Sequence, residues 1–149
     1  MNSMKNNVQP MPVLLMGLVL SVLFVPHAAW AADPQLEKAI LQGKDSFAHS
    51  TFGGNGKVCE SCHLAGGKEP GKLPNGKSIP SLANAAAIFP RIRQKDGKLV
   101  TLPDQIRSCI AMALQGTPPD YGGEELNALA SYVTSLAQGK PIDMGGLPQ

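Results

Sequence analysis

Two cysteines and a histidine stand together in the run Cys59-Glu60-Ser61-Cys62-His63. Cysteines three positions apart lie on one side of a helical turn, where each thiol can form a thioether with a vinyl group of a porphyrin. The adjoining imidazole then lies under the porphyrin iron as an axial ligand. The spacing therefore predicts one covalently bound haem c, with Cys59 and Cys62 as the attachment residues and His63 as the proximal iron ligand.

A zinc site and a thioredoxin-like redox pair also use closely spaced cysteines. Zinc needs a tetrahedral ligand set, yet the remaining candidates are Cys109, His49 and His27, and there is no second C-x-x-C. A thioredoxin-like pair follows a β-strand, whereas the residues from Gly53 to Lys57 are typical of a loop. Haem attachment is therefore favoured over both alternatives.

The N-terminus has the pattern of a secretory signal. Lys5 precedes an apolar run from Met11 to Val25, and Ala29-Trp30-Ala31 offers an A-x-A cleavage site. The apolar run is short of the roughly 20 residues that span a bilayer. We expect residues 1–31 to be a signal peptide, residues 32–149 to form a cytochrome c domain in the periplasm, and no stable membrane anchor to remain after cleavage. Export agrees with haem attachment, which takes place outside the bacterial cytoplasm.

Charge and composition narrow the choice of partners. The formal net charge of the whole chain is only +2, so nothing in it favours nucleic acid or another polyanion. Aromatic residues make up 5% of the chain, which leaves few large side chains for a core. A buried haem would supply the missing apolar bulk.

The mature chain is predicted to form helices separated by loops rich in glycine and proline. Asp33 before Pro34, and Thr101 before the next apolar stripe, are typical helix N-caps, and Asp96-Gly97 is typical of a hairpin turn. The predicted elements are a helix from Pro34 through Phe47, a haem-bearing turn from Lys57 to Leu64, a loop from Ala65 to Pro80, a short helix from Ser81 through Ala87, a hairpin between Ile92 and Thr101, a helix from Thr101 to Gly116, and a last helix from Glu124 to Ala137. The fold class that follows is all-α, a small monohaem cytochrome c-like helical domain with long Gly/Pro-rich loops. The residues after Gly139 carry no apolar stripe and are expected to form a mobile tail.

The sixth iron ligand is the open question. Small electron-carrying cytochromes commonly use a methionine in the loop before the last helix, but the loop from Gly116 to Gly123 has none. Met112 lies in the preceding helix and Met144 in the tail, and both remain alternatives. Cys109 is left unpaired in an oxidising compartment and shares an apolar stripe with Ile110, so it is either a buried core residue or a ligand. We favour Cys109 as the ligand.

Several of these residues recur together in one family. They are Cys59 to Leu64, Phe89-Pro90-Arg91 with Arg93, Thr101-Leu102, Cys109 and Gly116. The set resembles the tetrathionate-forming thiosulfate dehydrogenases and the catalytic haem subunit of the Sox thiosulfate-oxidising cytochrome complex. The resemblance extends from about Phe52 to Gly139.

The resemblance implies roles for particular residues. Cys109 would be the distal iron ligand and would handle the substrate sulfur, while Arg91 and Arg93 would hold the sulfur oxyanion. The family commonly has an arginine one helical turn before the cysteine, where this chain has Gln105, and Arg107 is expected to point away from that site. Family enzymes also use a second haem, whereas this chain has one C-x-x-C-H, so a redox partner protein must accept the electrons.

Two functions follow. The first is a periplasmic monohaem c-type cytochrome in electron transfer, linked to inorganic sulfur oxidation and steered to a partner cytochrome or oxidoreductase subunit by a basic rim. The second is a haem enzyme or enzyme subunit that acts on thiosulfate or tetrathionate at a haem ligated by His63 and Cys109, with Cys109, Arg91 and Arg93 as catalytic residues. In the first function Arg91 and Arg93 belong, with Lys95 and Lys98, to the solvated rim.

Overall fold

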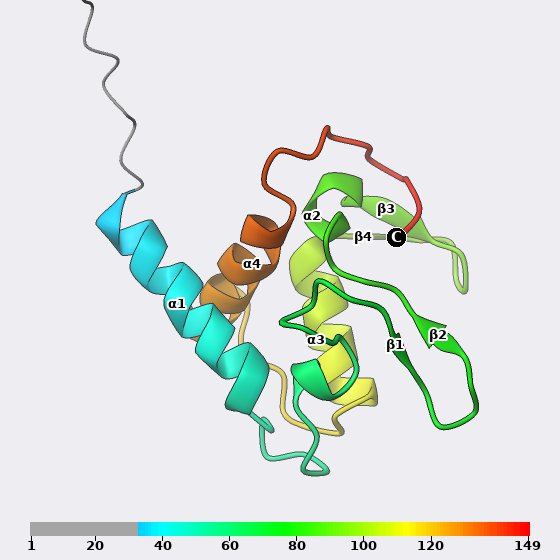
Figure 1. Ribbon diagram of the computed structural model, residues 1–149, viewed down its shortest axis with the longest axis horizontal. Coiled ribbons are helices and arrows are strands. Elements are labelled where there is room, and N and C mark those ends of the chain that lie inside the picture. Colours follow the sequence, from blue (N-terminus) through cyan, green and yellow to red (C-terminus); the bar gives the residue numbers. More distant parts are fainter. Residues whose placement is uncertain (1–32) are drawn as a thin grey trace, which may run out of the picture. The chain divides into compact units, whose positions relative to one another are not determined.

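The computed structural model describes residues 33–149 (Figure 1). The expected signal peptide, residues 1–31, lies outside the described residues. In chain order the elements are α1 (Pro34–His49), the 3-10 turn η1 (Cys59–Ser61), β1 (Gly71–Lys72), β2 (Ser78–Ile79), α2 (Ala85–Ile88), β3 (Arg91–Arg93), β4 (Lys98–Val100), α3 (Leu102–Met112) and α4 (Glu124–Leu136). Helices dominate and the strands are short, so the predicted all-α class is confirmed. From residue 33 onward, no helix has the length and apolar character that crossing a membrane would require.

Helices α1 and α4 cross and pack against each other (Figure 1). Helix α1 begins as predicted, because the Asp33 carboxylate accepts a hydrogen bond of 2.8 Å from the Gln35 amide. The two helices approach closely at Gly43, where a Cβ atom would lie only 2.0 Å from the Ala128 carbonyl oxygen. A glycine is therefore required at this crossing.

The core lies between α1, α3 and α4. Its buried members are Phe47, Ile110, Leu114, Leu129 and Tyr132. The rings of Phe47 and Tyr132 meet edge to face with centroids 5.3 Å apart. The Tyr132 hydroxyl donates to the Gly66 carbonyl at 2.7 Å, so the core also fixes the loop that follows the C-x-x-C-H run.

Helix α3 begins with the predicted cap. The Asp104 amide donates to the Thr101 hydroxyl, and the Thr101 amide donates to the Asp104 carboxylate at 2.8 Å. The helix ends at Met112, before the expected Gly116: Gln115 adopts a positive φ of 54°, and the Gly116 amide donates back to the Ile110 carbonyl at 3.1 Å, which closes the helix. The Leu114 carbonyl accepts a 2.8 Å hydrogen bond from the Asn55 amide.

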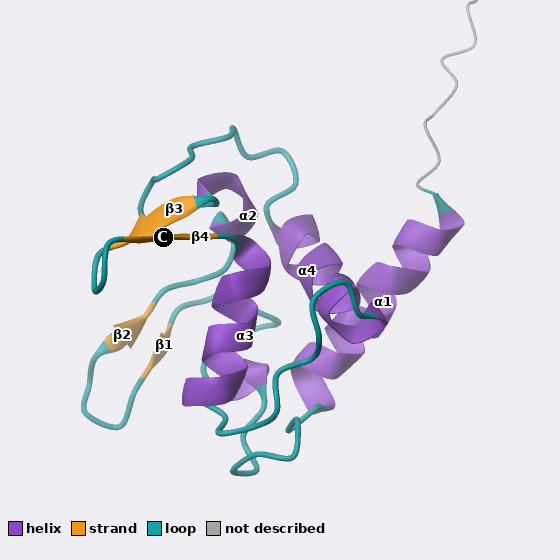
Figure 2. Cartoon of the chain, turned by 180° about the vertical axis from the view of Figure 1, so that it is seen from behind, coloured by secondary structure: helices purple, strands orange, loops and turns teal. Residues whose placement is uncertain are grey.

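Two small antiparallel hairpins lie on the other side of α3 from α1 (Figure 2). The first pairs β1 with β2 inside the segment that was predicted to be loop. The second pairs β3 with β4, as predicted around Asp96-Gly97, and sets Arg91 opposite Val100, Ile92 opposite Leu99, and Arg93 opposite Lys98. In each hairpin the side chains alternate between the two faces.

Helix α2 and the C-terminal residues differ from the prediction. The helix begins after Asn84, and Ser81 does not cap it, because the Ser81 hydroxyl accepts from the Ala83 amide at 3.4 Å, before the first helical residue. The Ser81 amide donates to the carbonyl of Gln149 at 2.7 Å. The residues expected to form a mobile tail lie along α2, where the amides of Asp143 and Gly145 donate to carbonyls of that helix at 2.8 and 2.9 Å. A four-residue helix leaves its last carbonyls free, and the tail satisfies them.

Candidate haem cavity

An apolar cavity of about 410 Å³ lies between the C-x-x-C-H turn, α2, β3 and α3. The polar or reactive side chains that line the cavity are those of the motif, Cys59, Cys62 and His63, together with Arg91, Gln105 and Cys109. The rest of the wall is mainly aliphatic or aromatic and comprises Val58, Leu73, Ile79, Pro80, Ser81, Leu82, Ala85, Ile88, Phe89, Ala113, Leu114 and Pro148. Such a wall suits a large apolar ligand that meets a few polar groups.

The two motif cysteines come from the turn η1. The amides of Cys62 and His63 both donate to the Cys59 carbonyl at 3.1 Å, which closes the turn and turns all three side chains toward the cavity. Burial, with a contribution from nearby Cys109, raises the pKa of the Cys59 thiol to about 12. Both cysteines are free thiols and available for a covalent bond.

His63 is oriented by the backbone. Its Nδ1 lies 3.1 Å from the Pro80 carbonyl oxygen, which can only accept a hydrogen bond. Nδ1 therefore carries the proton, and Nε2 keeps a free lone pair. Burial lowers the pKa of the imidazole, which favours this neutral form. A metal-binding histidine needs both features.

Cys109 reaches the same cavity from α3. Gln105, one helical turn earlier, donates from Nε2 to the Cys109 Sγ at 3.3 Å. Burial raises the pKa of the Cys109 thiol, and the Gln105 hydrogen bond acts in the opposite direction. Met112 and Met144 are 69% and 67% exposed, and neither lines the cavity. Of the three candidate sixth ligands, only Cys109 shares a cavity with His63.

Arg91 and Arg93 share one face of β3 but lie at opposite ends of the strand. Arg91 lines the cavity, and its Nε is buried without a hydrogen-bond partner among the described residues. Arg93 is not among the lining residues, because its guanidinium is bound to Asp96, with Nε 2.9 Å from Oδ1. Arg107 points away from the cavity, as expected, and its guanidinium carbon lies 4.3 Å from the centroid of the Tyr121 ring.

The two halves of the site are joined by the loop that precedes the motif. This loop crosses the end of α3 so closely that a Cβ at Gly54 would lie 2.0 Å from the Leu114 carbonyl oxygen. The Asn55 side chain also donates to the Ala113 carbonyl at 3.2 Å. The turn that carries Cys59 is therefore held directly against the helix that carries Cys109.

The groups around the cavity fit a haem c. Two free thiols can take its vinyl groups, the His63 Nε2 can bind iron, and the buried Arg91 Nε can pair with a propionate. Within residues 33–149, no three His, Cys, Asp or Glu side chains gather closely enough to hold a bare metal ion. The apolar wall suits the porphyrin ring.

The sequence did not predict a functional role for three groups of this cavity. They are the Pro80 carbonyl, the Gln105 amide and Pro148 of the tail. The four-residue spacing of Gln105 and Cys109 on a helix was a readable signal for their contact. The other two depend on long-range packing, which no local pattern encodes.

Comparison with known proteins identifies the wider relationship. Residues 42–142 match the family model described as SoxA/TsdA, cytochrome c domain. The chain is 30% identical over 123 residues to a thiosulfate dehydrogenase of Psychrobacter arcticus and 28% identical over 117 residues to one of Stutzerimonas stutzeri. These alignments cover 79% and 78% of this chain but only 36% of either relative, so the chain spans about a third of the length of these relatives.

Two solved structures of related proteins have a similar fold. Thiosulfate dehydrogenase (TsdBA) from Marichromatium purpuratum superposes with a TM-score of 0.62 at 26% identity, over 80% of this chain and 27% of that chain. SoxXA from P. pantotrophus superposes with a TM-score of 0.58 at 20% identity, over 74% of this chain and 37% of that chain. The fold seen in both is that of the cytochrome c domain described above.

Proposed function

Because the chain belongs to the SoxA/TsdA cytochrome c domain family, whose members carry covalently bound haem c, we propose that it is a monohaem c-type cytochrome that transfers electrons in thiosulfate oxidation. The observation that carries the proposal is the common cavity of the C-x-x-C-H side chains and Cys109. Relatives named thiosulfate dehydrogenase supply the substrate class.

In this proposal Cys59 and Cys62 attach the haem. Each thiol adds across one vinyl group, its sulfur bonding to one vinyl carbon and its hydrogen moving to the other. His63 binds iron through Nε2, the nitrogen left free by the contact with Pro80. Held by these residues, a haem would supply a one-electron Fe(III)/Fe(II) couple.

Cys109 is the proposed sixth ligand. A thiolate stabilises ferric iron and lowers the reduction potential relative to a methionine ligand. The Gln105 amide, 3.3 Å from the sulfur, draws electron density from a thiolate and limits this effect. The potential is thus set jointly by two residues of α3.

We further propose that the protein works in the periplasm after removal of residues 1–31, with a partner protein as electron acceptor. One haem holds a single electron, whereas joining two thiosulfate ions into tetrathionate releases two. The structural neighbours TsdBA and SoxXA support a partner subunit or cytochrome.

A second candidate function is oxidation of thiosulfate at the cavity itself. It is favoured by the buried Arg91 Nε, which has no partner among the described residues and could hold an oxyanion beside Cys109. Arg93 has a weaker claim, because its guanidinium is bound to Asp96. In this candidate Cys109 and Arg91 contact the substrate.

The experiment uses the purified haem-loaded protein with thiosulfate and, separately, tetrathionate. Haem reduction and sulfur products are followed with and without a second c-type cytochrome as acceptor. Turnover that Arg91→Met abolishes, while the haem spectrum stays unchanged, supports the enzyme. Electron exchange with the cytochrome without any sulfur product supports the carrier. A protein that carries no covalent haem contradicts both.

A further inference from the structure

The tail, which comprises the residues after Gly139, is connected to His63 through a single peptide group. The carbonyl of Pro80 accepts the hydrogen bond from the His63 Nδ1, 3.1 Å away. The N–H of the same peptide group belongs to Ser81 and donates to the backbone oxygen of Gln149 at 2.7 Å. Hydrogen bonds in a chain polarise one another, so each bond of this peptide strengthens the other. A change in the bond at Gln149 therefore alters the bond at His63.

Asn84 fixes the last residues of the tail. Its side chain is only 6% exposed, and it donates to the Leu147 carbonyl at 3.0 Å while accepting from the Gln149 amide at 3.2 Å. Asn84 occupies the N-cap position of α2, yet its side chain makes no capping hydrogen bond to that helix. Both ends of the side-chain amide instead bind the residues on either side of Pro148, which lines the cavity. Asn84 thus sets the register at which Gln149 meets Ser81.

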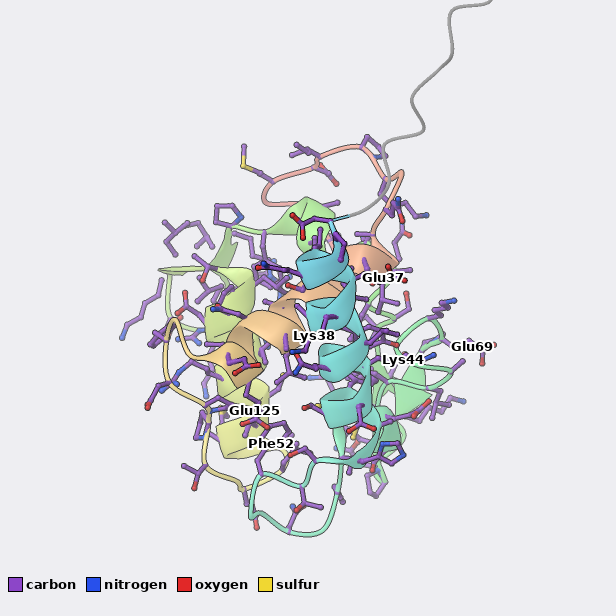
Figure 3. All side chains as sticks on the ribbon, turned by 90° about the vertical axis from the view of Figure 1, so that its left-hand side faces the viewer. Glu37, Lys38, Lys44, Phe52, Glu69 and Glu125 are labelled. Carbon is purple, nitrogen blue, oxygen red and sulfur yellow. The ribbon has the colours of Figure 1, made fainter. Side chains whose placement is uncertain are left out.

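The earlier part of the tail is held along α2. The amides of Asp143 and Gly145 donate to carbonyls of that helix at 2.8 and 2.9 Å. In Figure 1 and Figure 3 the chain that follows α4 passes over α2. The tail is therefore fixed both before and after Leu147, and Gln149 reaches Ser81 from a defined direction.

The Ser81 amide depends on this contact. Ser81 is 7% exposed, and a buried N–H without an acceptor is costly, so without the tail the peptide would turn toward another acceptor or a water molecule. Such a turn moves the Pro80 carbonyl away from His63. The next amide, that of Leu82, has an anchor of its own in the Gly67 carbonyl at 2.7 Å, and this anchor is the alternative to the tail.

We propose that the tail is a positioning segment: through Gln149 and the Pro80–Ser81 peptide, it sets the orientation of His63 and the strength with which the ring donates to iron. The proposal rests on the proposed function, because it needs His63 to bind a haem iron. A carbonyl that accepts from Nδ1 raises the basicity of Nε2, and a more basic ligand stabilises ferric iron and lowers the reduction potential. Loss of the Gln149 contact should therefore raise the potential.

The sign of this shift separates positioning from simple coverage of the cavity. Pro148 is part of the cavity wall, so a tail that moves away lets water approach the haem. Water stabilises the ferric form, which carries one more positive charge, and therefore lowers the potential. A tail that orients His63 and a tail that only excludes water thus predict shifts in opposite directions.

The deciding variant is the haem-loaded protein without Gln149. The deletion removes the acceptor of the Ser81 N–H, while Asn84 still holds Leu147 and keeps the adjoining Pro148 on the cavity wall. The matched control is Gln149→Ala, which retains the backbone oxygen and changes only an exposed side chain.

Asn84→Ala loosens the same contact by a second route. Asn84 does not line the cavity, so any effect of this variant on His63 must be transmitted through the tail or the peptide. Its control is Asn127→Ala, at an exposed asparagine that also donates to a backbone carbonyl, that of Gly122, at 3.1 Å.

Two measurements are made on each protein. A spectroelectrochemical titration gives the reduction potential, and proton NMR of the ferric protein gives the rate at which the His63 Nδ1 proton exchanges with solvent. At the wild-type midpoint potential, we expect deletion of Gln149 to raise the ratio of ferrous to ferric haem about threefold or more, the scale of one weakened hydrogen bond. Exchange of the Nδ1 proton should quicken by about tenfold in this variant and in Asn84→Ala, because opening of the bond to Pro80 limits it. Both controls should match the wild-type protein.

A lower or unchanged potential without Gln149 would overturn the proposal, because the tail would then only cover the cavity or leave His63 unaffected. Unchanged exchange of the Nδ1 proton would also overturn it, since the Leu82 anchor would then suffice to hold the peptide. Equal changes in Gln149→Ala or Asn127→Ala would overturn it as well. A wild-type protein that carries no covalent haem would count against the proposed function instead.

Discussion

At the scale of single residues, the function of the cavity depends on which polar atoms still have a lone pair free to bind a metal. His63 donates from Nδ1 to Pro80 and keeps Nε2 free. Cys109 accepts from Gln105, and burial, with a contribution from Cys62, raises the pKa of its thiol. Iron binding replaces the thiol proton, as it does for any thiolate ligand. The free His63 Nε2 and the Cys109 sulfur in one cavity support the proposed pair of iron ligands.

Gln105→Met should lower the reduction potential of the haem-loaded protein. Methionine has a similar length but no N–H, so the Cys109 thiolate would donate more strongly to ferric iron. Gln105→Arg restores a donor and should return the potential toward that of the wild-type protein. Gln42→Met, on the exposed surface of α1, is the matched control. The measurement is a spectroelectrochemical titration, and a potential that rises in Gln105→Met would contradict the assigned role.

At the scale of elements, the crossing of α1 and α4 depends on one small residue. Gly43→Ala improves helix propensity by about 1 kcal/mol. However, the new methyl group would overlap the Ala128 carbonyl at 2.0 Å, and overpacking typically costs about 1–3 kcal/mol. We expect the clash to dominate and the variant to have a lower Tm.

The neighbouring exposed position supplies the control for this prediction. Gln42→Ala gains much less helix propensity and removes only an exposed 3.4 Å hydrogen bond to Glu124, so it should change Tm little. Thermal unfolding followed by circular dichroism compares the two variants. Equal stability of Gly43→Ala and the wild-type protein would show that the helices can move apart at this crossing.

The start of α3 carries a pH-dependent contribution to stability. The Tyr121 hydroxyl, 2.6 Å from the Asp104 carboxylate, and the Thr101 cap lower the pKa of Asp104. A lowered pKa in the folded state contributes stability above the ordinary carboxyl value of about 4, and this stability is lost as the pH falls through the folded-state value. Asp104→Asn should therefore reduce Tm most near neutral pH, and the difference should shrink in acid.

The control for Asp104→Asn is Asp120→Asn, which removes an exposed carboxylate from the loop before α4. It should leave the pH dependence of Tm as it is in the wild-type protein. If Asp104→Asn lowered Tm by the same amount at every pH, the loss of stability would come from changed packing or hydrogen bonding and not from the lost charge.

The elements that could be predicted from sequence are those with local signals. Asp33 and Thr101 mark the starts of α1 and α3 because capping involves residues only two or three positions apart. The packing of the tail against α2 was not predicted because its partners come from far along the chain: Ser81 pairs with Gln149, and Asp143 pairs with Ala87. Local patterns cannot report such contacts.

At the scale of the whole molecule, the cavity is assembled from segments that are distant in sequence. The C-x-x-C-H motif was readable alone, whereas Cys109 was favoured by elimination and by family resemblance. Arg91 and Arg93 differ because Arg91 lines the cavity while Arg93 is bound to Asp96, which the sequence alone did not predict. The sequence did not predict that the tail packs on α2. The tail is held by backbone hydrogen bonds, which leave no pattern in the side chains.

The buried Asn84 side chain holds this tail. It donates to the Leu147 carbonyl at 3.0 Å and accepts from the Gln149 amide at 3.2 Å, beside the cavity residue Pro148. Asn84→Ala should release the tail and speed hydrogen exchange at the amides of Asp143 and Gly145. Asn75→Ala, at an exposed asparagine of the first hairpin, is the control. Unchanged exchange in Asn84→Ala would show that the backbone contacts suffice.

The central claim, a haem held between His63 and Cys109, is tested most directly by the ferric spectrum and reduction potential of Cys109→Ala beside Met112→Ala. Since Cys59 and Cys62 are untouched, both variants should keep covalent haem. We expect Cys109→Ala to lose the low-spin thiolate spectrum and to gain a higher potential. Met112→Ala, which removes a side chain that is 69% exposed, should match the wild-type protein. A ferric spectrum altered by Met112→Ala and unaffected by Cys109→Ala would contradict the claim.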